Sequence, residues 1–208
     1  VSVEQTTNMG GGRVWPQEAL RSVVDVAKRR GLRAHLDGAR LMNAVVASGV
    51  PAAQHAEGFD TAWVDFTKGL GAGVGACMAA SADLIDQAWR YKQMWGGSFR
   101  QSGFVAAGCL YALDNNIERL AEDHENARLL AQGLAEIPAV EIDPASVETN
   151  IVIFEVPDAA ALIASLAGQV ELSRAGGPRR VRAVTHMDVS RAEVEKALAL
   201  LSKSAVIR

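Results

Sequence analysis

The segment from Phe66 to Ala76, FTKGLGAGVGA, constrains the fold of this chain more than any other part. A short apolar run, Trp63–Phe66, precedes a single lysine, Lys68. A glycine-rich turn then leads into a second apolar run, Ala76–Met78. This pattern predicts a buried strand that ends near a lysine, beside a backbone that lets a flat ligand approach closely. A lysine in such a place is suited to act as a Schiff-base nucleophile.

A second motif, HLDGAR at 35–40, lies about one supersecondary unit upstream. We expect its strand to place Asp37 at the carboxyl edge of the sheet, where open α/β sheets bind their ligands. A lysine that traps an aldehyde, together with a carboxylate for a pyridine nitrogen, indicates pyridoxal 5'-phosphate as the cofactor. Two ordinary roles stay open, because Lys68 could be a surface lysine in a loop and Asp37 could cap the next helix.

Composition and charge narrow the class of protein. The chain has 208 residues, 49% of them hydrophobic, which suits one good-sized domain or one and a half. A net charge of −3 without a dense basic cluster argues against a nucleic-acid partner. With no signal-like start and no apolar run of spanning length, we expect no membrane association. Cys77 and Cys109 lie in small apolar runs, and we expect buried free thiols in a reducing, cytoplasmic compartment.

The order of apolar periods predicts an α/β fold, with a mainly parallel sheet in a large domain and a smaller α+β domain after it. We place the large domain at 1–118 and the small domain at 119–208. Strands are expected at 1–4, 32–36, 61–66, 76–80, 150–155, 170–173 and 181–184. Helices are expected at 16–30, 40–47, 51–56, 81–94, 101–114, 117–137, 158–167 and 190–201. In the fourth helix, we expect Leu84, Ile85, Ala88 and Trp89 to face inward.

Six segments, in order, carry a resemblance to a known family: TTNMGGGRVWP at 6–16, HLDGAR at 35–40, TKGLGAGVGA at 67–76, GGSFRQSG at 96–103, ERLAEDHENA at 118–127 and VRAVTHMDVS at 181–190. Together they resemble the low-specificity L-threonine aldolases among the beta-eliminating lyases, which are fold-type-I pyridoxal phosphate enzymes. The resemblance spans nearly the whole chain. In that family the chain begins well upstream of Val1, so we expect a missing N-terminal part that carries the phosphate-binding loop.

The resemblance implies a role for each of five residues. Lys68 matches the Schiff-base lysine, and Asp37 matches the carboxylate paired with the pyridine nitrogen. Arg40 and Arg182 match arginines that hold the substrate carboxylate. Arg100 matches an arginine that reaches the cofactor phosphate across a subunit interface. No metal site is expected.

Each arginine also has an ordinary interpretation from the sequence alone. Arg40 could form an ion pair with Asp37 or Asp60. Arg182 could be a solvated charge on one face of a strand. Arg100, after two glycines, could make an interface contact without chemistry.

The four histidines give no convincing base for catalysis. We expect His35 and His124 to be structural, His55 to be exposed, and His186 to lie at a strand end near Arg182. A base for the β-hydroxyl proton is needed in an aldolase, and it could lie in the missing segment.

The expected function is a retro-aldol cleavage of L-threonine and related β-hydroxy-α-amino acids to glycine and an aldehyde. The expected partners are a small amino-acid substrate and further copies of the chain, in a homodimer or homotetramer. Two alternatives remain: another pyridoxal phosphate reaction on the same scaffold, such as β-elimination or racemisation, and a fragment that binds without turnover.

Overall fold

The computed structural model describes residues 1–207. The chain divides into two compact units. The first contains Val1–Thr6 and Trp15–Arg119, and the second contains Thr7–Val14 together with the chain from Leu120 onward. The short loop 7–14 therefore belongs to a different unit from the segments on either side of it.

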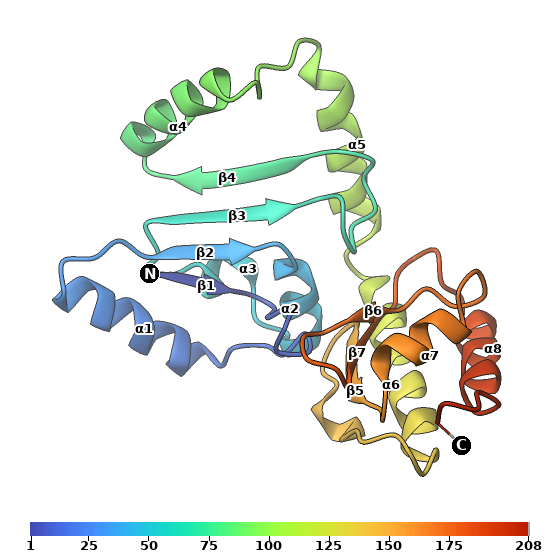
Figure 1. The fold of residues 1–208 in the computed structure, drawn as a ribbon. Coiled ribbons are helices and arrows are strands. Elements are labelled where there is room, and N and C mark those ends of the chain that lie inside the picture. Colours follow the sequence, from blue (N-terminus) through green and yellow to red (C-terminus); the bar gives the residue numbers. More distant parts are fainter. Residues whose placement is uncertain (208) are drawn as a thin grey trace. The chain divides into compact units, whose positions relative to one another are not determined.

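The first unit is built on a four-stranded sheet in the order β1-β2-β3-β4 (Figure 1). Its strands are β1 (Ser2–Glu4), β2 (His35–Gly38), β3 (Thr61–Asp65) and β4 (Ala76–Ala80). The strands β1, β2 and β3 run parallel, and β4 is antiparallel to β3. The mainly parallel sheet predicted from the sequence is confirmed.

Three helices connect the parallel strands of this unit. The helix α1 (Gln17–Arg29) lies between β1 and β2 in the sequence, and α2 (Leu41–Ser48) and α3 (Ala52–His55) lie between β2 and β3. The helix α1 buries Leu20, Val24 and Ala27 on one face, as its periodicity predicts. The strand expected from residue 32 begins only at His35. The Leu32 amide donates instead to the Ala27 carbonyl (2.9 Å) and closes the end of α1, with Gly31 in the left-handed conformation.

The remaining helices of the first unit, α4 (Ala82–Met94) and α5 (Ser102–Asn115), are largely open to solvent. The prediction that Trp89 faces inward is wrong, because its side chain is 57% exposed, and Leu84 is only half-buried. The expectation of buried thiols is also wrong: both cysteines are free, but Cys77 is exposed and Cys109 is half-buried. Cys77 is exposed because it lies on β4, which is at an edge of the sheet.

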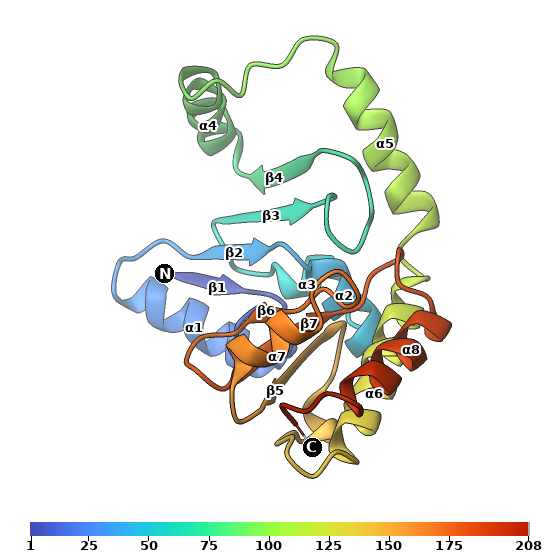
Figure 2. The same cartoon turned by 45° about the vertical axis from the view of Figure 1, so that its right-hand side comes forward.

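The second unit has an antiparallel sheet in the order β5-β7-β6. Its elements are α6 (Leu120–Ala135), the short 3-10 helix η1 (Pro144–Ser146), β5 (Ile151–Glu155), α7 (Ala159–Ser165), β6 (Ser173–Arg174), β7 (Arg180–Val184) and α8 (Arg191–Leu201). Helices α6 and α8 lie side by side (Figures 1 and 2), and their apolar faces form one core with the sheet. Ser190 and Glu193 form a capping box at the start of α8.

The loop 7–14 is held within the second unit by several hydrogen bonds. The Thr7 amide donates to the Arg13 carbonyl (3.1 Å), and the Gly12 amide donates to the Thr7 carbonyl (2.7 Å). The Thr149 hydroxyl donates to the Gly12 carbonyl (2.6 Å). Gly12 has a φ of 72°, and a Cβ there would lie 2.5 Å from the Thr149 hydroxyl, so this turn requires glycine.

Candidate functional site

The parallel strands bring Asp37 and Lys68 to one edge of the first sheet. Asp37 lies near the carboxyl end of β2, and Lys68 follows three residues after Asp65, the last residue of β3. Because β2 and β3 are parallel neighbours, their carboxyl ends meet at the same edge. The two residues therefore flank the position at which ligands bind in open α/β sheets.

Register and a ring contact show that both side chains lie over the same face of the sheet. Asp37 pairs in register with Trp63, so their side chains point to the same face. The Lys68 Nζ atom lies 5.5 Å from the centroid of the Trp63 ring. The ammonium of Lys68 and the carboxylate of Asp37 therefore lie on the same face of the sheet.

Asp65 is a partner of Lys68 that the sequence interpretation missed. Its carboxylate pairs with Lys68 and accepts hydrogen bonds from the Thr67 amide (2.8 Å) and hydroxyl (2.6 Å). Burial acts to raise the pKa of Asp65, but the hydrogen bonds from Lys68 and Thr67 outweigh it and leave that pKa below its usual value. An ionised Asp65 holds the Lys68 side chain, which is 35% exposed, at the strand end.

The Asp37 carboxylate is only partly engaged. Its Oδ1 atom accepts from the Ala39 amide (3.0 Å), and no hydrogen bond reaches Oδ2 from the described part of the chain. Arg40, not Asp37, is the N-cap residue of α2, without a side-chain cap. The competing role as a helix cap therefore does not use this carboxylate, and one oxygen stays available to a ligand.

Arg40 is half-buried at the start of α2. It lines a hollow of about 10 Å³ together with residues that include Asp65 and Gly69, which places it beside the end of β3. Asp60, one of the two carboxylates considered as its partner, is bonded to Arg33 (2.6 Å) and to the Ala34 amide (2.8 Å).

The other two predicted arginines lie elsewhere in the chain. Arg100 is exposed in the turn between α4 and α5 of the first unit. Arg182 lies on β7 of the second unit, where its Nη1 atom donates to Asn8 (2.6 Å) and its Nε atom donates to Ser173 (3.2 Å). The contact with Asn8 was also missed, although TTNMGGGR was singled out as a motif.

The prediction that His55 is exposed is wrong, because His55 is 1% exposed. Its Nδ1 atom lies 3.1 Å from the side-chain nitrogen Nε2 of Gln5 and 2.8 Å from the side-chain nitrogen Nε2 of Gln17. The Nε2 atom of His55 lies 3.3 Å from the Ser48 hydroxyl. Burial lowers the pKa of His55, which favours a neutral ring that accepts at Nδ1. The backbone N–H of Gln5 donates to the Asp37 carbonyl (2.8 Å). The contacts of Gln5 therefore connect His55 to the strand that carries Asp37.

The other histidines also have structural contacts. His35 contacts the Thr61 hydroxyl (2.7 Å) across the sheet. His124 is 3% exposed, and burial, with a smaller effect of the Arg128 charge, lowers its pKa to about 4. His186 lies beside Asp188 at the end of β7 (3.3 Å).

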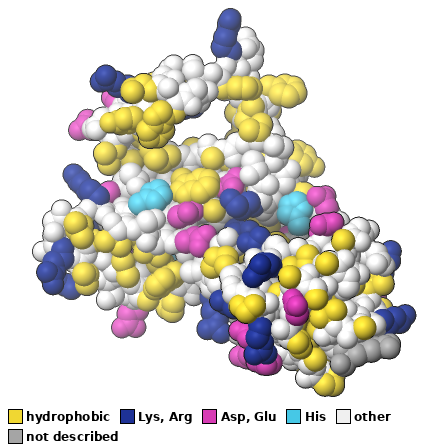
Figure 3. Space-filling view, in the orientation of Figure 1, with side chains coloured by type: hydrophobic (Ala, Val, Ile, Leu, Met, Phe, Trp, Pro, Cys, Tyr) yellow, Lys and Arg dark blue, Asp and Glu magenta, His cyan; other side chains and the backbone are white. Residues whose placement is uncertain are grey.

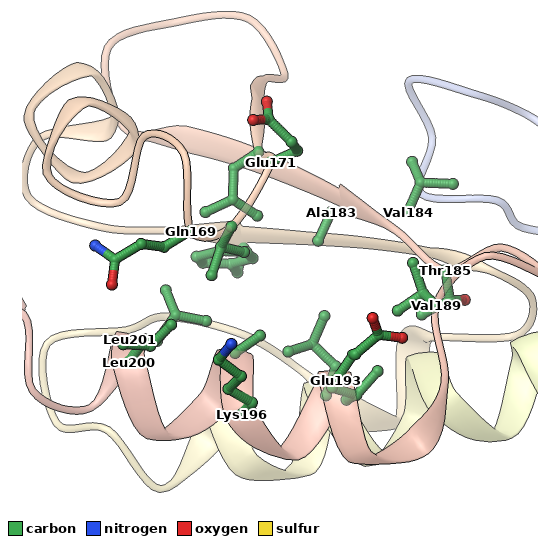
Figure 4. Close-up of a pocket in the computed structure, with 16 residues that line it drawn as sticks. Gln169, Glu171, Ala183, Val184, Thr185, Val189, Glu193, Lys196, Leu200 and Leu201 are labelled. Carbon is green, nitrogen blue, oxygen red and sulfur yellow. The ribbon is translucent and has the colours of Figure 1, made fainter.

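A separate cavity of about 340 Å³ lies in the second unit, between α8 and the sheet (Figure 4). Its walls are mostly apolar, and it contains none of the predicted site residues. Among its polar groups, Glu193 is already bonded in the capping box. This cavity is therefore not the site defined by Asp37 and Lys68.

Within residues 1–207, no cluster of histidine, cysteine, aspartate and glutamate side chains is arranged to hold a metal ion. Within the same range, no helix combines the length and the apolar character needed to cross a membrane.

Solved structures share this fold. A putative aromatic amino acid beta-eliminating lyase/threonine aldolase from Exiguobacterium matches 97% of the chain, with a TM-score of 0.81 and 23% identity over 61% of its own length. A putative L-allo-threonine aldolase from Listeria monocytogenes matches with a TM-score of 0.79 and 23% identity, over 97% of this chain and 59% of that one. The fold is the α/β fold of the fold-type-I enzymes, as predicted.

Sequence comparison gives the family. The beta-eliminating lyase family matches residues 1–157, and the chain belongs to this family. Low-specificity L-threonine aldolase from Escherichia coli K12 is 39% identical over 96% of this chain and 58% of its own length. Low-specificity L-threonine aldolase 1 from Arabidopsis thaliana is 34% identical over 98% of this chain and 58% of its own length. The chain thus spans a little under three fifths of these curated relatives.

Proposed function

We propose that this chain forms part of a pyridoxal phosphate-dependent lyase that cleaves L-threonine and related β-hydroxy-α-amino acids to glycine and an aldehyde. The observation that carries the proposal is the position of Asp37 and Lys68 on one face of the sheet, at the carboxyl ends of neighbouring parallel strands. The similarity to L-threonine aldolases from a bacterium and a plant supports the substrate class.

The residues present fit the cofactor. Lys68 offers an amine at the strand end, and Asp37 offers a carboxylate oxygen that no described residue engages. Pyridoxal phosphate, when bound, supplies an aldehyde for the amine and a ring that accepts electrons from the substrate's α-carbon. A carboxylate beside the ring nitrogen favours the protonated ring, which accepts electrons best.

The remaining residues of the site orient Lys68 and bind the substrate and the cofactor. Asp65 holds the Lys68 side chain near the ring of Trp63. Arg40 and Arg182 hold the substrate carboxylate, since a guanidinium fork matches a carboxylate bidentately. Fixing the carboxylate orients the bond to be broken relative to the cofactor ring, which is catalysis by orientation. We assign Arg100 to the cofactor phosphate across a subunit interface.

We further propose that residues 1–118 complete a large cofactor domain, that 119–208 form a small domain, and that the enzyme is a homodimer or homotetramer. Large apolar side chains gather over α4 and α5, among them Trp89, Trp95 and Phe104 (Figure 3), and such exposed patches are typical of subunit contacts. The free thiols of Cys77 and Cys109 support a reducing, cytoplasmic location.

Product analysis of the holoenzyme that contains this chain tests the proposed reaction. With L-threonine, we expect equal amounts of glycine and acetaldehyde, and no activity in the Lys68→Ala variant. A keto acid and ammonia from L-threonine or L-serine would instead show that the enzyme eliminates, which is the alternative reaction. Inversion of L-threonine at its α-carbon would show a racemase.

A further inference from the structure

The guanidinium of Arg182 is held from two directions within the second unit. Ser173 on β6 pairs in register with Arg182 on β7, and its hydroxyl accepts from Nε (3.2 Å). From the loop 7–14, the Asn8 Oδ1 atom accepts from Nη1 (2.6 Å). One contact thus comes from the neighbouring strand, and the other comes from a loop near the start of the chain.

These contacts use two of the donors of the guanidinium. A guanidinium has five N–H donors, one on Nε and two on each terminal nitrogen. Ser173 takes the donor on Nε, and Asn8 takes one of the two on Nη1. Nη2 makes no hydrogen bond to the part of the chain that the structure describes. The terminal nitrogens therefore keep donors that a carboxylate can accept.

Both holding groups are themselves fixed. Asn8 lies in a loop closed by hydrogen bonds between Thr7 and Arg13 and between Gly12 and Thr149. Ser173 is part of β6, and its hydroxyl also lies 3.4 Å from the Arg182 carbonyl. An arginine side chain loses rotamer entropy when it is ordered. Contacts that order the side chain before the substrate arrives reduce what carboxylate binding must supply.

We propose that Asn8 and Ser173 are positioning residues that set the specificity of the site for a substrate carboxylate, by presenting the remaining donors of Arg182 in one orientation. The proposal rests on the proposed function, in which Arg182 binds that carboxylate. A purely structural alternative exists, in which the same hydrogen bonds only tie the loop 7–14 to β7.

Two variants, Asn8→Asp and Ser173→Ala, together test the two interpretations. The new carboxylate has the same shape as the amide and strengthens the tie to Arg182, so a structural tie survives. It also neutralises the guanidinium and competes for its donors, so binding of the substrate carboxylate fails. Ser173→Ala is the second variant, because it removes the contact at Nε without adding a charge.

The experiment measures the dissociation constants of glycine and of glycinamide, which lacks the carboxylate, by calorimetry on the holoenzyme. Asn8→Asp is expected to weaken glycine binding about a hundredfold, and Ser173→Ala about tenfold, the loss of one charge-assisted hydrogen bond. Glycinamide affinity and the unfolding temperature should stay at the parental values. The KM for L-threonine should rise in parallel while kcat changes little.

Arg174→Ala is the matched control. Arg174 neighbours Ser173 but donates to the Gly177 carbonyl (2.8 Å), so its loss removes a positive charge without touching Arg182. Parental glycine binding in Ser173→Ala, or equal losses for glycine and glycinamide, would overturn the positioning role. Parental glycine binding in Arg182→Ala would instead refute the assignment of Arg182 in the proposed function.

Discussion

Lys68 lies over the indole ring of Trp63, with its Nζ atom 5.5 Å from the ring centroid. Trp63 in turn pairs in register with Asp37 on the next strand. These two relationships place an amine and a carboxylate on one face of the sheet, although 31 sequence positions separate Asp37 from Lys68 (68 − 37).

Asp37→Asn should lower kcat by roughly a hundredfold or more, the size of two or more pKa units of lost charge stabilisation. The amide keeps the shape of the side chain but cannot favour a protonated ring nitrogen. Its oxygen can still accept from the Ala39 amide, so the unfolding temperature should stay close to the parental value. Turnover near the parental rate, with the cofactor bound, would show that Asp37 has only a structural role.

The loop that presents Asn8 gives a prediction about stability. Gly11 and Gly12 both have positive φ values, so alanine at either position costs about 1 kcal/mol of unfolding free energy. At Gly12 the new Cβ would also lie 2.5 Å from the Thr149 hydroxyl, whereas at Gly11 it would meet nothing within 4 Å. In urea unfolding, Gly12→Ala should therefore lose about 1 kcal/mol more than Gly11→Ala. Equal losses would show that the loop does not pack against Thr149.

His124 makes the stability of the second unit depend on pH. Burial lowers its pKa to about 4 in the folded state, against 6.5 for the unfolded chain. Between these values the unfolded state binds more protons, so stability should fall as the pH falls from 6.5 to about 4, by roughly 2–3 kcal/mol. Urea unfolding across this range should show a smaller decrease for His124→Gln. An unchanged pH dependence would show that His124 ionises normally in the folded state.

Much of the fold could be predicted from local patterns. Apolar periods predict the strands β3 and β4 and the helix α8 close to their observed bounds. The start of β2 was placed too early because the Leu32 amide completes the end of α1, a contact that propensity does not reveal.

Fewer of the contacts in the candidate site could be predicted from the sequence. Lys68 and Asp37 stand out locally, one before a glycine-rich turn and the other at a strand end. The contact between Asn8 and Arg182 joins residues 174 positions apart, and no periodic pattern encodes such a pairing. His55 was misjudged for the same reason, since its burial depends on glutamines from two other segments.

The proposed function depends most directly on Lys68 as the residue that carries the cofactor. Borohydride reduction of the holoenzyme, followed by peptide mass analysis, identifies the lysine to which pyridoxal phosphate is attached. Lys92 is the matched control, because its ammonium also lies over an indole ring, 4.5 Å from the centroid of Trp89. We expect a pyridoxyl group on Lys68, lost in Lys68→Ala and kept in Lys92→Ala. A pyridoxyl group on any other lysine, or undiminished labelling of Lys68→Ala, would contradict this assignment.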